Sequence, residues 1–147
     1  MIEIKEVTSK KEQKAFLNFP LDLYKGNMNY VPALYMDEKK IFRDDYVYNT
    51  SCDAVFFNAY KDGVIAGRVE GIIQKDANAK NGERRARFTR FESIDDPQVA
   101  KALLDAAENW ARSKGMDTIH GPIGYSDLEK EGLLIEGFDV PGNFETT

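Results

Sequence analysis

The stretch from residue 54 to residue 74 constrains the fold of this chain more than any other part. Residues 54–60 read Ala-Val-Phe-Phe-Asn-Ala-Tyr and are rich in strand-forming side chains. Asp62-Gly63 follows, a dipeptide that tolerates the positive φ angles of a tight β-hairpin. Residues 64–74 then predict the returning strand. The chain is therefore expected to contain an antiparallel sheet.

A third antiparallel strand is expected over residues 84–94, after a polar connection at residues 76–83. By alternation, Ala86 and Phe88 share one face of this strand, whereas Phe91 falls on the opposite face. A β-bulge between Phe88 and Phe91 would bring all three side chains to one core. A strand that is buried on both faces explains the same pattern, so both interpretations stay open.

The clearest helix signal follows this strand. Asp95 and Asp96 are suited to a helix cap and Pro97 to the first turn, so a helix is predicted over residues 97–113. Residues 116–120 predict a further strand, which would make the helix a crossover between parallel strands. The expected buried stripe of the helix consists of Val99, Leu103, Ala106, Ala107 and Trp110.

Before the hairpin, residues 2–7 predict a first strand. Ser9 and Glu12 fit a capping box, and the helix that they begin is expected to reach about Asn18, because Pro20 interrupts helices. Residues 34–42 are a candidate second helix.

Ser126 and Glu129 offer another capping box near the end of the chain, which predicts a short final helix. No closing helix or strand follows before Thr147. We therefore expect residues 1–147 to be one domain and an N-terminal fragment of a longer chain; a frayed natural terminus is the alternative.

The composition of the chain argues against several classes of binding partner. The formal net charge of the 147 residues is -5, which argues against general nucleic-acid binding and against a polybasic membrane-surface protein. The one cysteine, Cys52, cannot form an internal disulfide, and the N-terminus does not read as a signal peptide, so the cytoplasm is the expected location. No cluster of histidine and cysteine suggests a metal site.

The order of these elements resembles that of the GNAT superfamily of acyl-CoA N-acyltransferases. Residues 56–71, Phe-Phe-Asn-Ala-Tyr-Lys-Asp-Gly-Val-Ile-Ala-Gly-Arg-Val-Glu-Gly, resemble the second and third strands of that family. Residues 120–139 resemble part of longer, uncharacterised bacterial GNAT-like proteins. The resemblance implies an α/β (α+β) fold with a mixed, mostly antiparallel sheet flanked by helices, here without the last strands of the family.

The resemblance also implies a reaction, the transfer of an acetyl or other acyl group from acyl-CoA to a small-molecule amine. Glu92 would then be the base and Tyr125 the acid; the simpler interpretations are a solvated strand-end glutamate and a packed tyrosine. In the family, the cofactor pairs with the edge of the bulged strand. The candidate cofactor-binding residues here are Arg87, Thr89, Arg90, Phe91 and Ser93.

The sequence departs from the family where the glycine-rich phosphate loop is expected. Residues 92–97 contain no glycine and three carboxylates. A carboxylate about 4 Å from a phosphate charge near a protein surface opposes binding by about 4 kcal/mol. An alternative function is therefore a non-catalytic GNAT-like module that has lost CoA binding and serves in structure or interaction. Whether the chain is an enzyme stays open at this point.

Three further features have weaker interpretations. His120 is able to act as a base and Cys52 as a nucleophile, although structural roles are the commoner ones. The basic residues of the third strand suit a CoA phosphate or RNA, with CoA favoured on an acidic chain; a solvated face is the simpler interpretation. They are Arg84, Arg85, Arg87 and Arg90. An open sheet edge would favour a homodimer.

Overall fold

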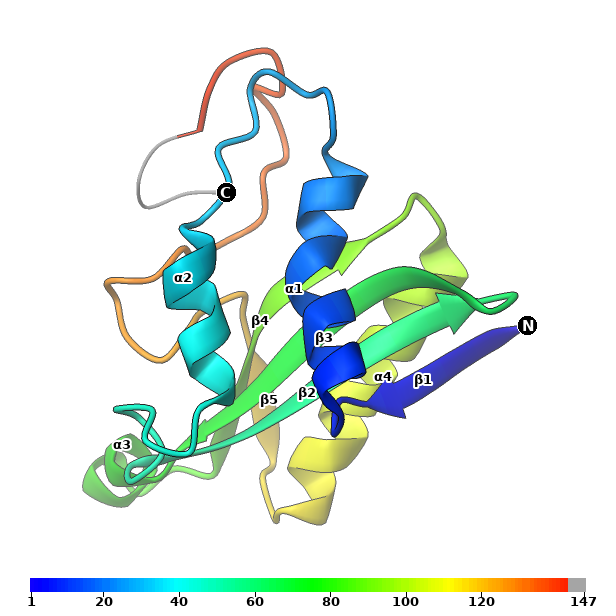
Figure 1. Cartoon of the computed structure of the whole chain (residues 1–147). Coiled ribbons are helices and arrows are strands. Elements are labelled where there is room, and N and C mark those ends of the chain that lie inside the picture. Colours follow the sequence, from blue (N-terminus) through cyan, green and yellow to red (C-terminus); the bar gives the residue numbers. More distant parts are fainter. Residues whose placement is uncertain (143–147) are drawn as a thin grey trace.

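The computed structural model describes residues 1–142 as a sheet with helices on both faces (Figure 1). None of the helices within these residues is long and apolar enough to cross a membrane. In chain order, the elements are β1 (Ile2–Glu6), α1 (Lys10–Leu23), α2 (Tyr35–Glu38), the 3-10 helix η1 (Lys39–Phe42), β2 (Cys52–Lys61), β3 (Val64–Gln74), α3 (Lys75–Asn81), β4 (Arg85–Ser93), α4 (Pro97–Ser113) and β5 (Thr118–His120).

The five strands lie in the order β1-β2-β3-β4-β5. Neighbouring strands among β1 to β4 are antiparallel, and β5 runs parallel to β4. Both central residues of the β2–β3 turn have positive φ, 50° at Asp62 and 82° at Gly63, as the Asp-Gly sequence predicts. The predicted hairpin and the predicted crossover helix are both confirmed.

The helices divide the molecule into three layers. The long helix α4 covers one face of the sheet, and α1 and α2 cover the other (Figure 1). Two glycines of β3 let α4 lie close to the strands. A Cβ atom at Gly67 would lie 2.7 Å from Cδ1 of Leu103, and one at Gly71 would lie 2.9 Å from Cε3 of Trp110. The close contact between α4 and the sheet therefore requires glycine at these positions.

Helix α1 begins at the predicted capping box of Ser9 and Glu12, but the predicted end near Asn18 is wrong. The helix continues through Pro20 to Leu23. Proline has no amide hydrogen, so it leaves the carbonyl of Phe16, four residues earlier, without its helical donor. Nη1 of Arg68 on β3 donates to this carbonyl at 3.0 Å. A side chain from the sheet thus satisfies the carbonyl that the proline leaves free.

Two other predictions differ from the structure. The expected polar connection after β3 contains α3, which ends at Gly82 in the left-handed conformation with φ 66°. The capping box predicted at Ser126 is wrong, and no helix follows α4 within residues 1–142. The carboxylate of Glu129 accepts a hydrogen bond from the backbone amide of Tyr125 at 2.8 Å. This contact holds a loop beside β4 where a helix was expected.

Candidate functional site

The central feature of the candidate site is a bulge in β4. Glu92 pairs with Arg68 and Thr89 pairs with Glu70, so one residue of β3 faces two residues of β4. Arg90 adopts a left-handed φ of 48° at this point. The predicted bulge is thereby confirmed. It directs the guanidinium of Arg90 to the α1 and α2 face, while the ring of Phe91 stays in the core with Phe88.

Beside the bulge, β4 and β5 separate. The two strands pair only from Arg85 to Arg87 of β4. One more contact follows, in which the amide of Ile123 donates to the carbonyl of Phe88 at 2.9 Å. From Thr89 to Ser93, no strand among residues 1–142 pairs with the outer edge of β4. The backbone of this stretch is therefore able to pair with an extended ligand.

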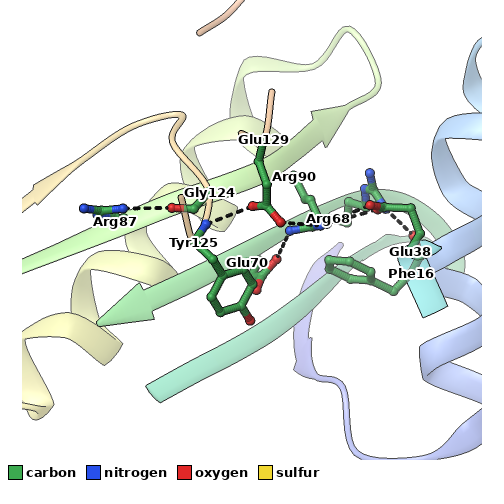
Figure 2. A network of polar contacts seen from close by, with 9 residues as sticks. All are labelled: Phe16, Glu38, Arg68, Glu70, Arg87, Arg90, Gly124, Tyr125 and Glu129. Carbon is green, nitrogen blue, oxygen red and sulfur yellow. Dashed lines mark hydrogen bonds and ion pairs between the residues drawn. The ribbon is translucent and has the colours of Figure 1, made fainter. Parts of the chain in front are cut away.

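Arg90 lies among three carboxylates on the buried side of the bulge (Figure 2). Its Nη1 is 2.7 Å from Glu70, its Nε and Nη2 each donate to Glu38 at 3.0 Å, and Nη2 is 3.5 Å from Glu129. Burial opposes the charge of Arg90, but the carboxylates of Glu70 and Glu38 outweigh it and raise the pKa of the guanidinium. One side chain thus joins β3, β4, α2 and the loop after β5.

The carboxyl of Glu70 is buried in a way that disfavours its charged form. Its side chain is fully buried, and burial raises the pKa of Glu70 although the charge of Arg90 acts to lower it. Glu38 is nearer the surface, and there Arg90 outweighs the effect of burial and lowers the pKa of Glu38. The two carboxyls bind the same guanidinium, yet their environments shift their pKa values in opposite directions.

Glu92, the predicted base, lies two residues beyond Arg90 on the same strand. The hydroxyl of Tyr24 donates to its carboxylate at 2.5 Å, and the rings of Tyr24 and Tyr30 stack with centroids 4.3 Å apart. Burial is the largest influence on Glu92 and raises its pKa, although Tyr24 and Arg68 act to lower it. A carboxylate with a raised pKa is a stronger base than an ordinary glutamate, which suits it to accept a proton.

Tyr125, the predicted acid, is 1% exposed and lies within an aromatic cluster. Its ring stacks on that of Tyr48 at 5.0 Å and meets the edge of Tyr46 at 5.3 Å. Burial and the charge of Glu70 raise the pKa of Tyr125. The structure therefore places Tyr125 beside Glu70, whereas the hydroxyl that contacts Glu92 is that of Tyr24.

The five predicted cofactor-binding residues all lie on β4, but their side chains are buried or make contacts within the protein. Arg87 donates to the carbonyl of Gly124 at 3.0 Å, and Ser93 donates to the carbonyl of Ile94 at 2.8 Å. Thr89 is buried, Phe91 packs in the core and Arg90 is held by its carboxylates. The backbone of this stretch is freer to bind a ligand than its side chains are.

The connection between β4 and α4 has an acidic residue at the helix start. Oδ1 of Asp96 accepts a hydrogen bond from the amide of Gln98 at 2.9 Å, and Lys61 forms an ion pair with the same carboxylate. The hydrogen bond from Lys61 is the largest cause of the lowered pKa of Asp96. The carboxylate of Asp96 thus binds the amide of Gln98 at the N-terminus of α4, where the family resemblance implies a phosphate.

The remaining candidates have local partners. Arg84 lies 3.1 Å from Asp117, and Arg85 lies 3.2 Å from Glu83, so the basic residues of β4 do not converge on one point. Burial and the nearby Arg85 lower the pKa of His120. Cys52 is buried, and burial raises the pKa of its thiol, which disfavours the reactive thiolate.

Five polar residues around Arg90 and Glu92, here called the polar cluster, were not predicted from the sequence. They come from the C-terminal end of α1, from α2, from β3 and from the loop after β5. A signal for two of them was present, because β3 carries two charged residues within an otherwise apolar run of a central strand. Buried charges require partners, and this points to a polar network on that face. The missed residues are Tyr24, Glu38, Arg68, Glu70 and Glu129.

Solved structures with the same arrangement were found among acetyltransferases. A tandem GNAT protein from the clavulanic acid biosynthesis pathway matches 88% of this chain and 39% of its own, with a TM-score of 0.63 and 13% identity. The chain has the GNAT fold. The aminoglycoside acetyltransferase AAC(6')-Iy, solved with a bisubstrate analogue of CoA, matches 86% of this chain and 82% of its own, with a TM-score of 0.59 and 16% identity.

Curated relatives were found by sequence. Protein YghO of Escherichia coli K12 is 34% identical over 141 residues, 94% of this chain and 35% of its own length. The bacterial ceramide synthase of Caulobacter vibrioides is 29% identical over 137 residues, 92% of this chain and 36% of its own length. The chain thus spans about a third of the length of these relatives. No protein-family model matches the chain.

Proposed function

We propose that this GNAT-fold domain transfers an acyl group from a CoA thioester to an amine, with Glu92 as the base. The observation that carries the proposal is the position of Glu92. Its partly buried carboxyl, with a raised pKa, lies on a bulged strand whose outer edge has no partner strand within residues 1–142. In the reaction, Glu92 would accept the proton that the amine loses as its nitrogen bonds to the acyl carbon.

Two tyrosines would assist in different ways. Tyr24 would orient the carboxylate of Glu92 through the 2.5 Å hydrogen bond. Tyr125 would protonate the sulfur that leaves as the C–S bond breaks. The hydroxyl is protonated at neutral pH, as a proton donor must be, although its raised pKa makes it a weaker acid than an ordinary tyrosine. Tyr125 is 1% exposed, so a ligand would reach its hydroxyl only after the loop that holds it moves away from β4.

The residues present fit one part of acyl-CoA and not another. The unpaired edge from Thr89 to Ser93 suits the amide groups of a pantetheine arm. At the start of α4, in contrast, Asp96 already accepts a hydrogen bond from the amide of Gln98 and carries its own negative charge. We therefore propose that the thioester arm binds along β4 and that the pyrophosphate does not bind at the α4 terminus.

The second candidate is a non-catalytic GNAT-fold module. The observation that favours it is the same acidic start of α4, since Asp96 would repel the phosphates of the cofactor. Fold alone does not decide between the two candidates.

Calorimetric titration of acetyl-CoA into the folded chain is the experiment that separates them. Micromolar binding supports the acyltransferase, and an Asp96→Asn variant should leave this affinity within a few-fold if the phosphates lie elsewhere. No detectable heat at millimolar acetyl-CoA, with a native circular dichroism spectrum, rejects the acyltransferase for this chain and leaves the module.

If acetyl-CoA binds, the role of Glu92 is tested by turnover. Amine acceptors would be screened by thiol release, with long-chain amines included because one relative is named a ceramide synthase. Glu92→Gln should lower kcat by about 100-fold or more and leave the affinity for acetyl-CoA unchanged. The wild-type rate should fall on the acid side at a pH above the usual glutamate range, because burial raises the pKa of Glu92. Glu136→Gln, at an exposed glutamate, is the control; an equal loss in both variants contradicts the proposal.

A further inference from the structure

A concave region is lined by residues of α1, of α2 and η1, and of the loop that follows η1. It is a groove of about 710 Å³ between α1 and the segment formed by α2 and η1. Figure 1 shows these two helical segments on the same face of the sheet, with α1 nearer to β1 and α2 nearer to β4. None of the residues placed at the acyl-transfer site lines this groove, so it is available for a different ligand.

One wall of the groove is a single stripe of α1. Lys10, Gln13, Lys14 and Leu17 follow a spacing of three and four residues, which places them on one side of a helix. Leu17 is buried at one end of the stripe. The two lysines at the other end are one helical turn apart, a spacing at which like charges repel weakly. An anion between them would remove this repulsion.

The opposite wall repeats this arrangement of cations and apolar groups. Tyr35, Lys39 and Phe42 are spaced by four and three residues along α2 and η1 and line the same groove. Tyr35 is 39% exposed, whereas Phe42 packs its ring against Phe16 beneath the groove. The groove therefore combines an apolar floor, an accessible aromatic ring and lysines contributed by both walls.

The charges that line the groove are unbalanced, with four cations against two carboxylates. Arg43 is paired with Asp45 through two hydrogen bonds of 2.7 Å, and Asp44 is the other carboxylate of the lining. Among residues 1–142, no carboxylate lies within ion-pair distance of the three lysines, Lys10, Lys14 and Lys39. A positive groove is unexpected on a chain whose formal net charge is -5.

We propose that this groove binds a phosphate monoester that carries an aromatic ring. The phosphate would lie among the three lysines, which would donate to its oxygens from both walls. The ring would lie against Tyr35 above the apolar floor of Leu17 and Phe42. This site is separate from the acyl-transfer site, so it does not depend on the binding of acyl-CoA.

The test uses phenyl phosphate as the probe and inorganic phosphate as its ring-free counterpart. Each would be titrated into the ¹⁵N-labelled chain, with amide shifts followed by NMR. Phenyl phosphate should shift the amides of residues 10–17 and 35–43 with one saturable affinity. Inorganic phosphate should shift the same amides with about tenfold weaker affinity, because it lacks the stacking ring.

The triple variant Lys10→Gln, Lys14→Gln, Lys39→Gln should weaken phenyl phosphate binding by roughly 100-fold, since an exposed ion pair contributes up to about fivefold in affinity. The matched control, Lys80→Gln, Lys101→Gln, Lys114→Gln, makes the same change in net charge at exposed positions outside the groove and should leave the affinity within twofold. Equal weakening in both variants, or shifts scattered over the surface, overturns the site. Equal affinity for the two probes overturns the role of the ring.

Discussion

The face of the sheet beneath α4 is buried by apolar side chains, whereas the face beneath α1 and α2 buries charged side chains beside an apolar cluster. The apolar face is built from residues such as Val69 of β3 and Leu103 of α4. The charged face holds Arg90, which lies in the bulge, and Glu70, which forms an ion pair with it at 2.7 Å. The two faces belong to the same strands, so the alternation of side chains along β3 and β4 produces both.

This difference bears on what each face contributes. Burial of apolar surface stabilises a fold in proportion to its area and sets few requirements on geometry. A buried ion pair adds little net stability, because desolvation offsets the attraction, but it fixes the positions of its members. We infer that the α4 face mainly holds the domain together and that the opposite face mainly fixes the geometry around Glu92.

The largest expected effect on stability comes from removing the guanidinium of Arg90 at the centre of the charged face. Arg90→Met should lower the free energy of unfolding by about 4 kcal/mol, because it leaves the fully buried carboxylate of Glu70 and the half-buried one of Glu38 without their partner. Urea unfolding at neutral pH measures this change. Arg84→Met is the matched control, since Arg84 pairs with Asp117 at the surface and should cost less than about 1 kcal/mol. Similar losses in the two variants would mean that the buried cluster has no special energetic cost.

The apolar face should respond to a different kind of change. Leu103→Ala is expected to lower the free energy of unfolding by about 3 kcal/mol, because Leu103 is fully buried against β3 and its removal leaves a cavity. Leu128→Ala is the control, because Leu128 is 78% exposed and should change stability by less than about 0.5 kcal/mol. A loss below about 1 kcal/mol at Leu103 would contradict the role assigned to this face.

The two faces also differ in how far the sequence predicts them. The hairpin at Asp62-Gly63 and the bulge before Phe91 follow from local patterns, and both are confirmed. The α4 stripe is confirmed in part: Val99, Leu103 and Ala107 are buried, whereas Ala106 and Trp110 are half-buried and Ala111 is buried in addition. The polar cluster does not follow in this way, because its members come from segments distant in the chain, as with Glu38 and Arg90. The continuation of α1 through its proline was missed for the same reason, since the compensating donor lies on β3.

A double-mutant cycle tests whether Arg68 compensates for the hydrogen bond that Pro20 cannot make. The expected change in stability is the smallest of the three. Arg68→Met removes the donor to the carbonyl of Phe16, whereas Pro20→Ala restores a backbone amide able to bond with the same carbonyl. The two changes should therefore be less than additive, with a coupling of about 1 kcal/mol in the free energy of unfolding. Leu21→Ala, one residue further along α1, should combine additively with Arg68→Met. If the first pair is additive too, the arginine does not compensate for the proline, and its burial would have to be explained by the charges of Glu92 and Glu38 alone.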